Sequence, residues 1–395
     1  MTLQNINSNV TFVGVKHWDR RLFDELIPLP HGTSYNSYLV QGSEKIALID
    51  TVDPEVFEHL LLNLNQSGIN SIDYIIANHA EQDHSGSIPF VLEKYPEVKI
   101  VTNEKCKGML LELMPIKEEA FIVIKDEEIL SLGDKHLKFL LTPWVHWPET
   151  MSTYLMEDEI LFSCDFFGAH IAASELFVKN EAIVLESAKR YYAEIMMPFR
   201  AKIKNNLEKL KDYKISYIAP SHGLVYNRPE LIINAYQEWI SPAVKNEVVI
   251  PYVSMHGSTK KMVEHLIEEL SVYDIIVKPF NLTVSDLGEL AMSLVDAATV
   301  ILASPMVLAG AHPEVLYGAA LINALRPKTK FVGIMSSYGW GGMIEKQLRA
   351  MLSKMKVEFF PILMVKGEPK QDDYAAIIKL AKSIKLKHDE LKIGG

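Results

Sequence analysis

Cysteine is scarce in this sequence. Cys106 and Cys164 are the only two among its 395 residues. Two thiols are too few for a four-cysteine iron centre or for a framework of disulfide bonds. Because the chain also contains 13 histidines, we expect any bound metal to be held by nitrogen and oxygen atoms.

Basic residues and long apolar runs are also lacking. Lys plus Arg total 40 against 50 Asp plus Glu, which gives a net charge of −10 and disfavours binding along a nucleic-acid backbone. No stretch approaches the roughly 18 consecutive apolar residues of a membrane span. The first ten residues have neither the basic start nor the apolar stretch of a secretory signal. We therefore expect a cytoplasmic protein that binds neither nucleic acid nor a membrane.

The composition and the order of apolar segments predict a folded α/β protein. An apolar fraction of 48% is typical of globular chains, and at roughly 150 residues per domain the length favours two or three domains. The first part mixes short strands, hairpin turns and helices, as in a layered sandwich. From about residue 246, five strands alternate with five helices, which predicts a doubly wound parallel sheet. We therefore divide the chain into residues 1–245 and 246–395.

Candidate metal ligands cluster directly after the predicted strand Ile72–Ala77. His79, Glu81, Asp83 and His84 fall within six residues. In an extended loop, alternate side chains at positions 79, 81 and 83 project in related directions and His84 points elsewhere. Such a loop can serve two metal ions at once. A single histidine is usually an ordinary polar residue, but this density of ligand types favours metal binding.

Three further candidates follow later predicted strands, namely His146, Asp165 and His222. Each lies at a strand-to-loop junction, where an α/β scaffold gathers its site. The seven candidates, which we predict to be both metal-binding and catalytic, offer four imidazoles, three carboxylates and no thiolate. Zinc accepts such ligands, whereas three carboxylates favour iron or manganese. If two ions lie about 3.5–4 Å apart, one carboxylate must bridge them, and Asp165 is the best candidate.

Three loops of the second part each follow a predicted strand, at the edge where a doubly wound sheet binds its ligand. The first precedes a helix, so its hydroxyl and backbone N–H groups can bind an anion. Its single glycine matches neither the dinucleotide nor the Walker pattern, which favours a monophosphate. The residues that we expect to bind a cofactor are Ser254, Met255, His256, Gly257, Ser258 and Thr259 in the first loop, Ser304, Pro305, Met306, Val307, Leu308, Ala309 and Gly310 in the second, and Ser337, Tyr338, Gly339, Trp340 and Gly341 in the third.

Taken together, these motifs resemble the flavodiiron proteins. The H-x-E-x-D-H loop at 79–84, the ligands His146, Asp165 and His222, and the flavodoxin-like second part carry this resemblance over about residues 8–390. The first part is similar to the metallo-β-lactamase fold, an αββα sandwich. Hydrolases of that fold carry H-x-H-x-D-H, so that Glu81 replaces an imidazole here, and a carboxylate suits iron better than zinc.

The resemblance implies FMN in a flavodoxin-like domain and a non-heme diiron site that reduces O2 to water or NO to N2O. It also implies a head-to-tail homodimer or a homotetramer, in which the FMN of one chain approaches the diiron site of another. By position, His79, Glu81 and His146 would bind one iron, Asp83, His84 and His222 would bind the other, and Asp165 would bridge them.

The electron donor is the least determined part of this interpretation. Members of the family accept electrons from rubredoxin, or, in a methanogen branch, from reduced coenzyme F-420. The segments 15–24 and 254–259 look most like the methanogen branch, which favours a coenzyme F-420H2 oxidase. Lys16, Arg20 and Arg21 are candidates to bind the acidic tail of that donor. Two alternatives stay open: a rubredoxin-dependent O2 or NO reductase, and a dizinc hydrolase with a regulatory flavodoxin module.

Overall fold

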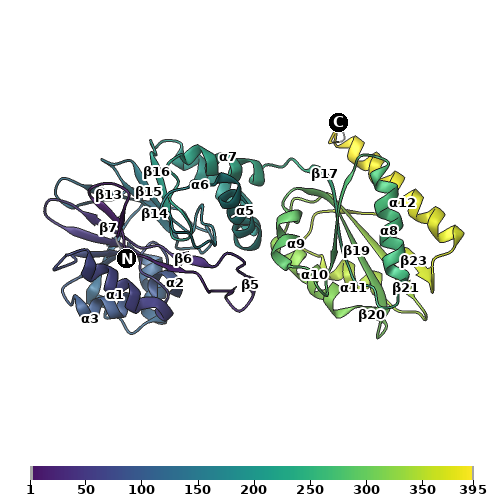
Figure 1. The fold of residues 1–395 in the computed structure, drawn as a ribbon, viewed down its shortest axis with the longest axis horizontal. Coiled ribbons are helices and arrows are strands. Elements are labelled where there is room, and N and C mark those ends of the chain that lie inside the picture. The colour runs from purple at the N-terminus through teal and green to yellow at the C-terminus, as the bar shows by residue number, and fades with distance from the viewer. Residues whose placement is uncertain (1–2, 394–395) are drawn as a thin grey trace. The chain divides into compact units, whose positions relative to one another are not determined.

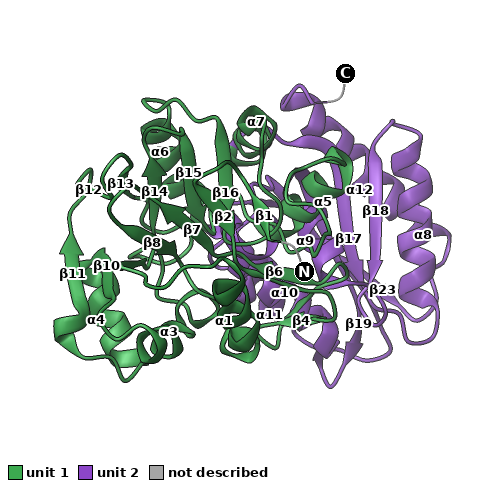
Figure 2. Cartoon of the chain, turned by 60° about the vertical axis from the view of Figure 1, so that its left-hand side comes forward, with its two compact units in different colours: residues 1–192, 199–240 green, residues 193–198, 241–395 purple. Residues whose placement is uncertain are grey.

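The computed structural model describes residues 3–393 and divides the chain into two compact units. Unit 1 contains residues 1–192 and 199–240, and unit 2 contains residues 193–198 and 241–395 (Figure 2). Each unit has its own sheets and its own core, and each is described by itself.

Unit 1 is built on two sheets (Figure 1). In the first, β8 to β11 are parallel, and β1, β2 and β7 extend the sheet with antiparallel pairs. In order across the sheet its strands are β1 (Gln4–Asn5), β2 (Val10–Phe12), β7 (Tyr38–Gln41), β8 (Ile46–Ile49), β9 (Tyr74–Ile76), β10 (Lys99–Asn103) and β11 (Phe121–Ile124). Two short ribbons pair β3 (Val15–His17) with β6 (Thr33–Tyr35) and β4 (Leu22–Phe23) with β5 (Ile27–Pro28).

The second sheet of unit 1 has five strands. They are β12 (Ile129–Ser131), β13 (His136–Leu141), β14 (Met151–Leu155), β15 (Ile160–Cys164) and β16 (Tyr217–Pro220), in this order. Because β14 is antiparallel to both β13 and β15, and β15 is parallel to β16, the strands β13, β15 and β16 all end at the same edge.

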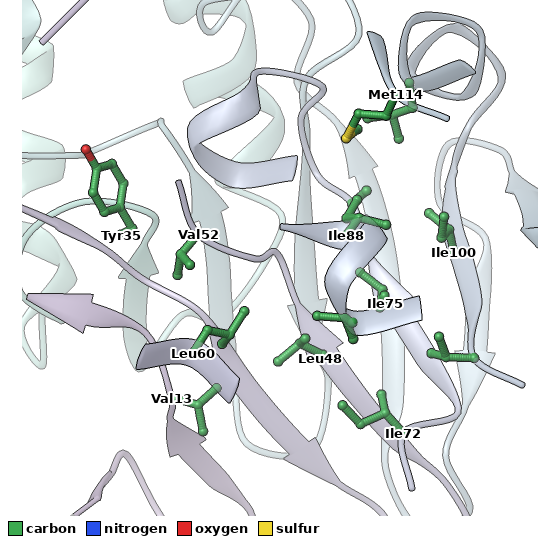
Figure 3. Close-up of a cluster of buried hydrophobic side chains, with 14 of the residues drawn as sticks. Val13, Tyr35, Leu48, Val52, Leu60, Ile72, Ile75, Ile88, Ile100 and Met114 are labelled. Carbon is green, nitrogen blue, oxygen red and sulfur yellow. The ribbon is translucent and has the colours of Figure 1, made fainter. Parts of the chain in front are cut away.

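The alternation of side chains along the strands produces two apolar layers in unit 1. Ile49 and Ile76 pack between the two sheets, whereas their neighbours Leu48 and Ile75 pack under the helices (Figure 3). The helices that carry this outer layer are α1 (Phe57–Gln66), α3 (Ile88–Lys94) and α4 (Glu104–Leu113). The second sheet adjoins α5 (Glu181–Tyr191), α6 (Arg200–Leu210) and α7 (Pro229–Ile240), and unit 1 is therefore a metallo-β-lactamase-like sandwich, as predicted.

Unit 2 is a flavodoxin-like domain around a parallel sheet, as predicted. The order across it is β18 (Ile276–Asn281), β17 (Lys245–Tyr252), β19 (Ala297–Val307), β21 (Phe331–Tyr338) and β22 (Glu358–Phe359). The last position is shared with β23 (Leu363–Lys366), because Pro361 separates the two short strands and has no N–H to donate. The helices are α8 (Ser258–Ser271), α9 (Leu287–Leu294), α10 (Pro313–Leu325), α11 (Ile344–Met351) and α12 (Gln371–Glu390).

Candidate metal centre and phosphate-binding cavity

The first group of candidate ligands joins His79, Glu81 and His146. His79 follows β9, and His146 lies in the loop between β13 and β14. Glu81 Oε2 lies 3.1 Å from Nε2 of His79 and 3.0 Å from Nε2 of His146. With one oxygen of Asp165, the ligand atoms of this group all lie within 4.8 Å of one another.

The second group joins Asp83, His84 and His222. Asp83 Oδ2 lies 3.3 Å from Nε2 of His84 and 3.1 Å from Nε2 of His222. All three side chains are buried, and His222 follows the end of β16. Each group therefore presents two imidazoles and one carboxylate of its own.

Asp165 lies between the two groups, at the end of β15. Its Oδ2 is 3.4 Å from Nε2 of His79 and 3.5 Å from Nε2 of His146. Its Oδ1 is 3.0 Å from Nε2 of His84 and 3.5 Å from Nε2 of His222. One oxygen thus faces each group, which is the arrangement that a bridging carboxylate requires.

Several atoms of this cluster are buried without a hydrogen-bond partner among the described residues. They are both carboxylate oxygens of Asp83, both of Asp165, and both ring nitrogens of His84. Buried polar atoms are nearly always paired in native proteins, and an unpaired set calls for a missing ion or water. Nitrogen and carboxylate donors are suitable ligands for iron, so the residues present fit a pair of such ions.

The electrostatic field of the cluster favours positive charge. Burial lowers the pKa of His79, but its hydrogen bonds with Glu149 and Glu81 hold that pKa well above the usual range. Burial likewise opposes protonation of His84, yet Asp83 and Asp165 raise its pKa to about 9. Two bound cations would satisfy the same field that otherwise attracts protons.

The predicted extended conformation of the loop 79–84 is wrong at its end. A short helix, α2 (Gln82–Ser85), begins directly after Glu81. Helical geometry turns the neighbours Asp83 and His84 toward the same group, whereas His79 and Glu81 serve the other. Alternation along a strand therefore does not describe how these side chains are divided.

Two buried carboxylates that the sequence did not single out support the loop. Asp50 accepts hydrogen bonds from the backbone N and the Nδ2 of Asn78, at 2.8 and 2.9 Å, and so fixes the residue before His79. Glu149 Oε1 lies 2.6 Å from Nδ1 of His79. The sequence offered one signal for Glu149, namely its position three residues after the candidate ligand His146. The histidine that it contacts, His79, is 70 residues away in sequence, so spacing alone does not reveal the pair.

Aromatic side chains enclose the centre. The ring of Trp147 packs edge-on against His79, with centroids 5.0 Å apart. His170, which is buried, lies 4.8 Å from the rings of both His222 and Phe23. Its Nδ1 is 2.9 Å from the hydroxyl of Thr33. Phe23 belongs to the β4–β5 ribbon, so this ribbon reaches the second ligand group.

Unit 2 contains a cavity at the carboxyl ends of its strands. It is lined by Ser254, Met255, His256, Ser258, Thr259, Pro305, Met306, Ser337, Tyr338, Gly339 and Gly367. Gly257 adopts a φ of +93° before α8. In the first turn, Ser254 Oγ accepts a hydrogen bond of 3.1 Å from the backbone N–H of Lys260. The N–H groups at the start of a helix, ahead of Lys260, suit an anion. A Cβ on Gly339 or Gly367 would meet open space, so these residues border room for a flat ligand.

Only some of the residues predicted to bind a cofactor line this cavity. Ser304 is buried, and its hydroxyl accepts a hydrogen bond from the backbone N of His312, because β19 continues to Val307 and pairs with β20 (Gly310–Ala311). Gly367, beyond β23, lines the cavity although the sequence did not single it out. The predicted residues outside the lining are Gly257, Ser304, Val307, Leu308, Ala309, Gly310, Trp340 and Gly341.

Among the helices of residues 3–393, none combines the length and the apolar character that crossing a membrane would demand.

Comparisons with known proteins extend over nearly the whole chain. Residues 33–223 match the model of the ODP family beta lactamase. The coenzyme F420H2 oxidase of Methanothermobacter marburgensis is 33% identical over 364 residues, which cover 88% of this chain and 90% of the relative. The nitric oxide reductase of Moorella thermoacetica is 33% identical over 388 residues, which cover 96% and 97%.

Solved structures show the same likeness. Rubredoxin oxygen:oxidoreductase from Desulfovibrio gigas superimposes with a TM-score of 0.94 and 30% identity, over 98% of this chain and 99% of that structure. A flavodiiron protein from Giardia intestinalis superimposes with a TM-score of 0.90 and 26% identity, over 98% of each chain. Both units of the chain are therefore similar to those of these structures.

Proposed function

The chain belongs to the flavodiiron protein family, and from this we propose that it is a cytoplasmic oxidase that reduces O2 to water. In this proposal, reduced coenzyme F-420 supplies the electrons, which pass through FMN to a non-heme diiron site. The family relation itself supports an oxidoreductase that acts as an oxidase or a nitric oxide reductase. We propose residues 1–245 as the diiron domain and residues 246–395 as the FMN-binding domain.

The observation that carries the proposal is the position of Asp165. Its two oxygens face two separate ligand groups, and neither oxygen has a hydrogen-bond partner among the described residues. A carboxylate so placed favours two adjacent metal ions over one. The seven proposed iron ligands are His79, Glu81, Asp83, His84, His146, Asp165 and His222.

The side chains of unit 1 have separable tasks in this reaction. Bound iron would supply one-electron redox chemistry at two adjacent centres. Glu81 and Asp83 each contribute one negative charge to their own group, and Asp165, whose two oxygens face different groups, contributes one to both. The rings of Phe23 and Trp147 lie against ligand histidines and limit the access of water to the centre.

The cavity of unit 2 suits a flavin mononucleotide. Bound FMN would accept a hydride and pass on single electrons. Ser254, Ser258 and Thr259 place hydroxyl groups at the start of α8, where a single phosphate is favoured. Gly339 leaves room for the flat ring, and Trp340, which is 66% exposed, lies in the same loop.

We also propose that two chains associate head to tail, as a homodimer or as part of a homotetramer. Each unit has exposed apolar side chains close in sequence to its site. They are Trp18, Leu22, Leu26 and Trp144 in unit 1, and Met255, Leu308, Trp340 and Met343 in unit 2. Large exposed apolar side chains favour protein contacts, and pairing those of unit 1 with those of unit 2 would bring FMN of one chain to the diiron site of the other.

The choice of donor rests on likeness to the F420H2 oxidase of Methanothermobacter marburgensis. Of the three candidate cations for its acidic tail, Lys16 donates to Gln4 and two backbone carbonyls, and Arg20 pairs with Glu55 at 2.7 Å. Arg21 is exposed, and within residues 3–393 its side chain donates only to the backbone carbonyls of Trp18 and Arg20, so it is the most suitable of the three.

A rubredoxin-dependent O2 or NO reductase is the second candidate, because the relative from Moorella thermoacetica is a nitric oxide reductase and the neighbour from Desulfovibrio gigas is a rubredoxin oxidoreductase. Stopped-flow mixing of the oxidised protein with each reduced donor tests the choice. We expect reduced F-420 to bleach the FMN absorbance within the turnover time. If reduced rubredoxin bleaches the FMN absorbance and reduced F-420 does not, rubredoxin replaces F-420 as the proposed donor.

A dizinc hydrolase with a regulatory flavodoxin module is the distant alternative. Metal analysis of the purified protein separates it from an oxidase. We expect about two iron ions per chain together with O2 consumption. Zinc in place of iron, with ester or lactam hydrolysis and no O2 consumption, would establish the hydrolase.

A further inference from the structure

The two ligand groups differ in what lies behind their histidines. Nδ1 of His79 is 2.6 Å from the carboxylate of Glu149. Nδ1 of His222 is 2.7 Å from the backbone carbonyl of Ser34. Nδ1 of His84 is buried and has no hydrogen-bond partner among the described residues. A full negative charge therefore supports a histidine of the first group, and a neutral dipole supports one of the second.

Glu149 is held firmly in place. The residue is 3% exposed, and the oxygen that lies against His79 also accepts a hydrogen bond of 3.0 Å from the backbone N–H of Ala80. Its own backbone carbonyl accepts a hydrogen bond of 2.7 Å from Nδ2 of Asn103. One carboxylate oxygen thus fixes both the ring of His79 and the backbone that follows it.

The loop that carries Glu149 organises the whole first group. It contains His146, whose Nε2 is 3.0 Å from Glu81, and Trp147, whose ring packs on His79. A single segment between β13 and β14 therefore supplies one ligand and the anchor of another. The second group has no such segment: Asp83 and His84 come from α2, and His222 follows β16.

The ligands themselves do not distinguish the two positions. Each group has two imidazoles and one carboxylate of its own, and one oxygen of Asp165 faces each group. Asp50 is a further buried carboxylate that bonds to Asn78 and interacts electrostatically with both His84 and His79, but it forms no hydrogen bond to a ligand nitrogen. Among the carboxylates that do not belong to either ligand group, the direct hydrogen bond to a ligand histidine therefore comes from Glu149.

A carboxylate behind a metal-binding imidazole fixes its tautomer and makes it a stronger donor. We propose that Glu149 is a positioning residue that makes the two metal positions unequal. The ion held by His79, Glu81 and His146 is bound more tightly and is harder to reduce than the ion held by Asp83, His84 and His222. This inference rests on the proposed two-metal function.

The test substitutes Glu149→Gln, which keeps the shape and one accepting oxygen but removes the charge. Glu157→Gln is the matched control, because Glu157 Oε1 lies 2.7 Å from Nδ1 of His136 at the surface, away from the ligands. Metal-free proteins are titrated with Co2+ against a chelator, and the visible absorption of Co2+ is followed. We expect the wild type and the control to bind two equivalents with distinct affinities.

In Glu149→Gln, one equivalent should bind roughly 10- to 100-fold more weakly, and the other should change little. With iron, a spectroelectrochemical titration should show that the lower of the two metal potentials rises while the higher one stays. Glu149→Asp keeps the charge but shortens the side chain, so it should weaken binding of the same equivalent. If circular dichroism shows that the Gln variant is unfolded, the titrations are made with the Asp variant instead.

Equal weakening of both equivalents, or no change in either, would overturn the role of Glu149 while leaving the proposed function intact. A wild type that binds fewer than two ions would instead count against the proposed function itself. The two failures are thus distinguishable in one series of titrations.

Discussion

In unit 1 five of the seven proposed ligands are buried, among them Asp165 at 1% exposure, and Glu81 and His146 are partly buried, whereas in unit 2 Trp340 beside the cavity is 66% exposed. The metal centre is built from charged side chains that have few partners except one another. The cavity is built from hydroxyls, glycines and the start of a helix. A small, highly charged ion requires converging charges, whereas a large flat cofactor requires room and a few donors. The two sites should therefore respond very differently to substitution.

The largest effect should come from Asp165→Ala, which removes the carboxylate shared by both groups. We expect O2 reduction to fall to the rate of the flavin alone, because neither group keeps its fourth ligand. FMN content, measured by absorbance, should stay at the wild-type level. Retained O2 turnover would contradict the bridging role of Asp165. It would also show that the metal centre is no more sensitive to substitution than the cavity of unit 2.

Removal of metal should destabilise unit 1 selectively. At a metal concentration about 100 times Kd, binding contributes about 2.7 kcal/mol, which corresponds to a fall in Tm of roughly 5 to 10 °C on chelation. Calorimetry of the FMN-loaded protein, with and without chelator, measures the change. The transition assigned to unit 2 should stay in place. A parallel shift of both transitions would show that the sites are not independent.

A smaller effect is expected from Thr259→Ala at the start of α8. The Thr259 hydroxyl lies 2.8 Å from that of Ser337 and lines the cavity. Loss of about one hydrogen bond should weaken FMN binding by roughly tenfold, as followed by flavin fluorescence. The iron content should be unchanged, and a loss of iron in this variant would argue against separate sites.

The smallest effect concerns acid stability of unit 2. His388 is buried between Asn246 and Thr299, with Nδ1 and Nε2 at 2.7 and 2.8 Å from their oxygens. Burial, together with the charge of Lys385, lowers its pKa from 6.5 to about 4. The unfolded chain therefore binds a proton first, so stability should fall as the pH drops from 6.5 to 4.

Thermal melting of the metal-free protein between pH 7 and pH 4.5 checks this expectation. His388→Gln should reduce the pH dependence of the unit 2 transition, because glutamine does not titrate in this range. An unchanged dependence in the variant would assign the acid sensitivity to other groups.

The sequence predicted the fold well because its patterns are local. Short apolar runs such as Ile46–Ile49 and helical spacing in α8 follow from neighbouring residues alone. The candidate ligands could also be predicted from the sequence, because His79, Glu81, Asp83 and His84 are close together in the chain. Their division between two groups was predicted only through the family resemblance, since the helical turn at Gln82 is set by tertiary packing.

Other features depend on contacts that sequence spacing does not reveal. Glu149 reaches His79 across 70 residues, and Asp50 reaches Asn78 across 28. Ser304 was expected in the cofactor loop, but β19 extends past it and places its hydroxyl against the backbone of His312. Partners of this kind follow from the way the strands meet, and not from the local chemistry of the residues.

The ratio of donor consumed to O2 consumed tests the central proposal most directly. Reduction of O2 to two waters takes four electrons, so two molecules of reduced F-420 should disappear for each O2, without hydrogen peroxide. The iron-free protein with FMN should lose this activity. One donor per O2 with release of peroxide, at the same rate with and without iron, would show that the flavin alone reacts with oxygen and would contradict the account.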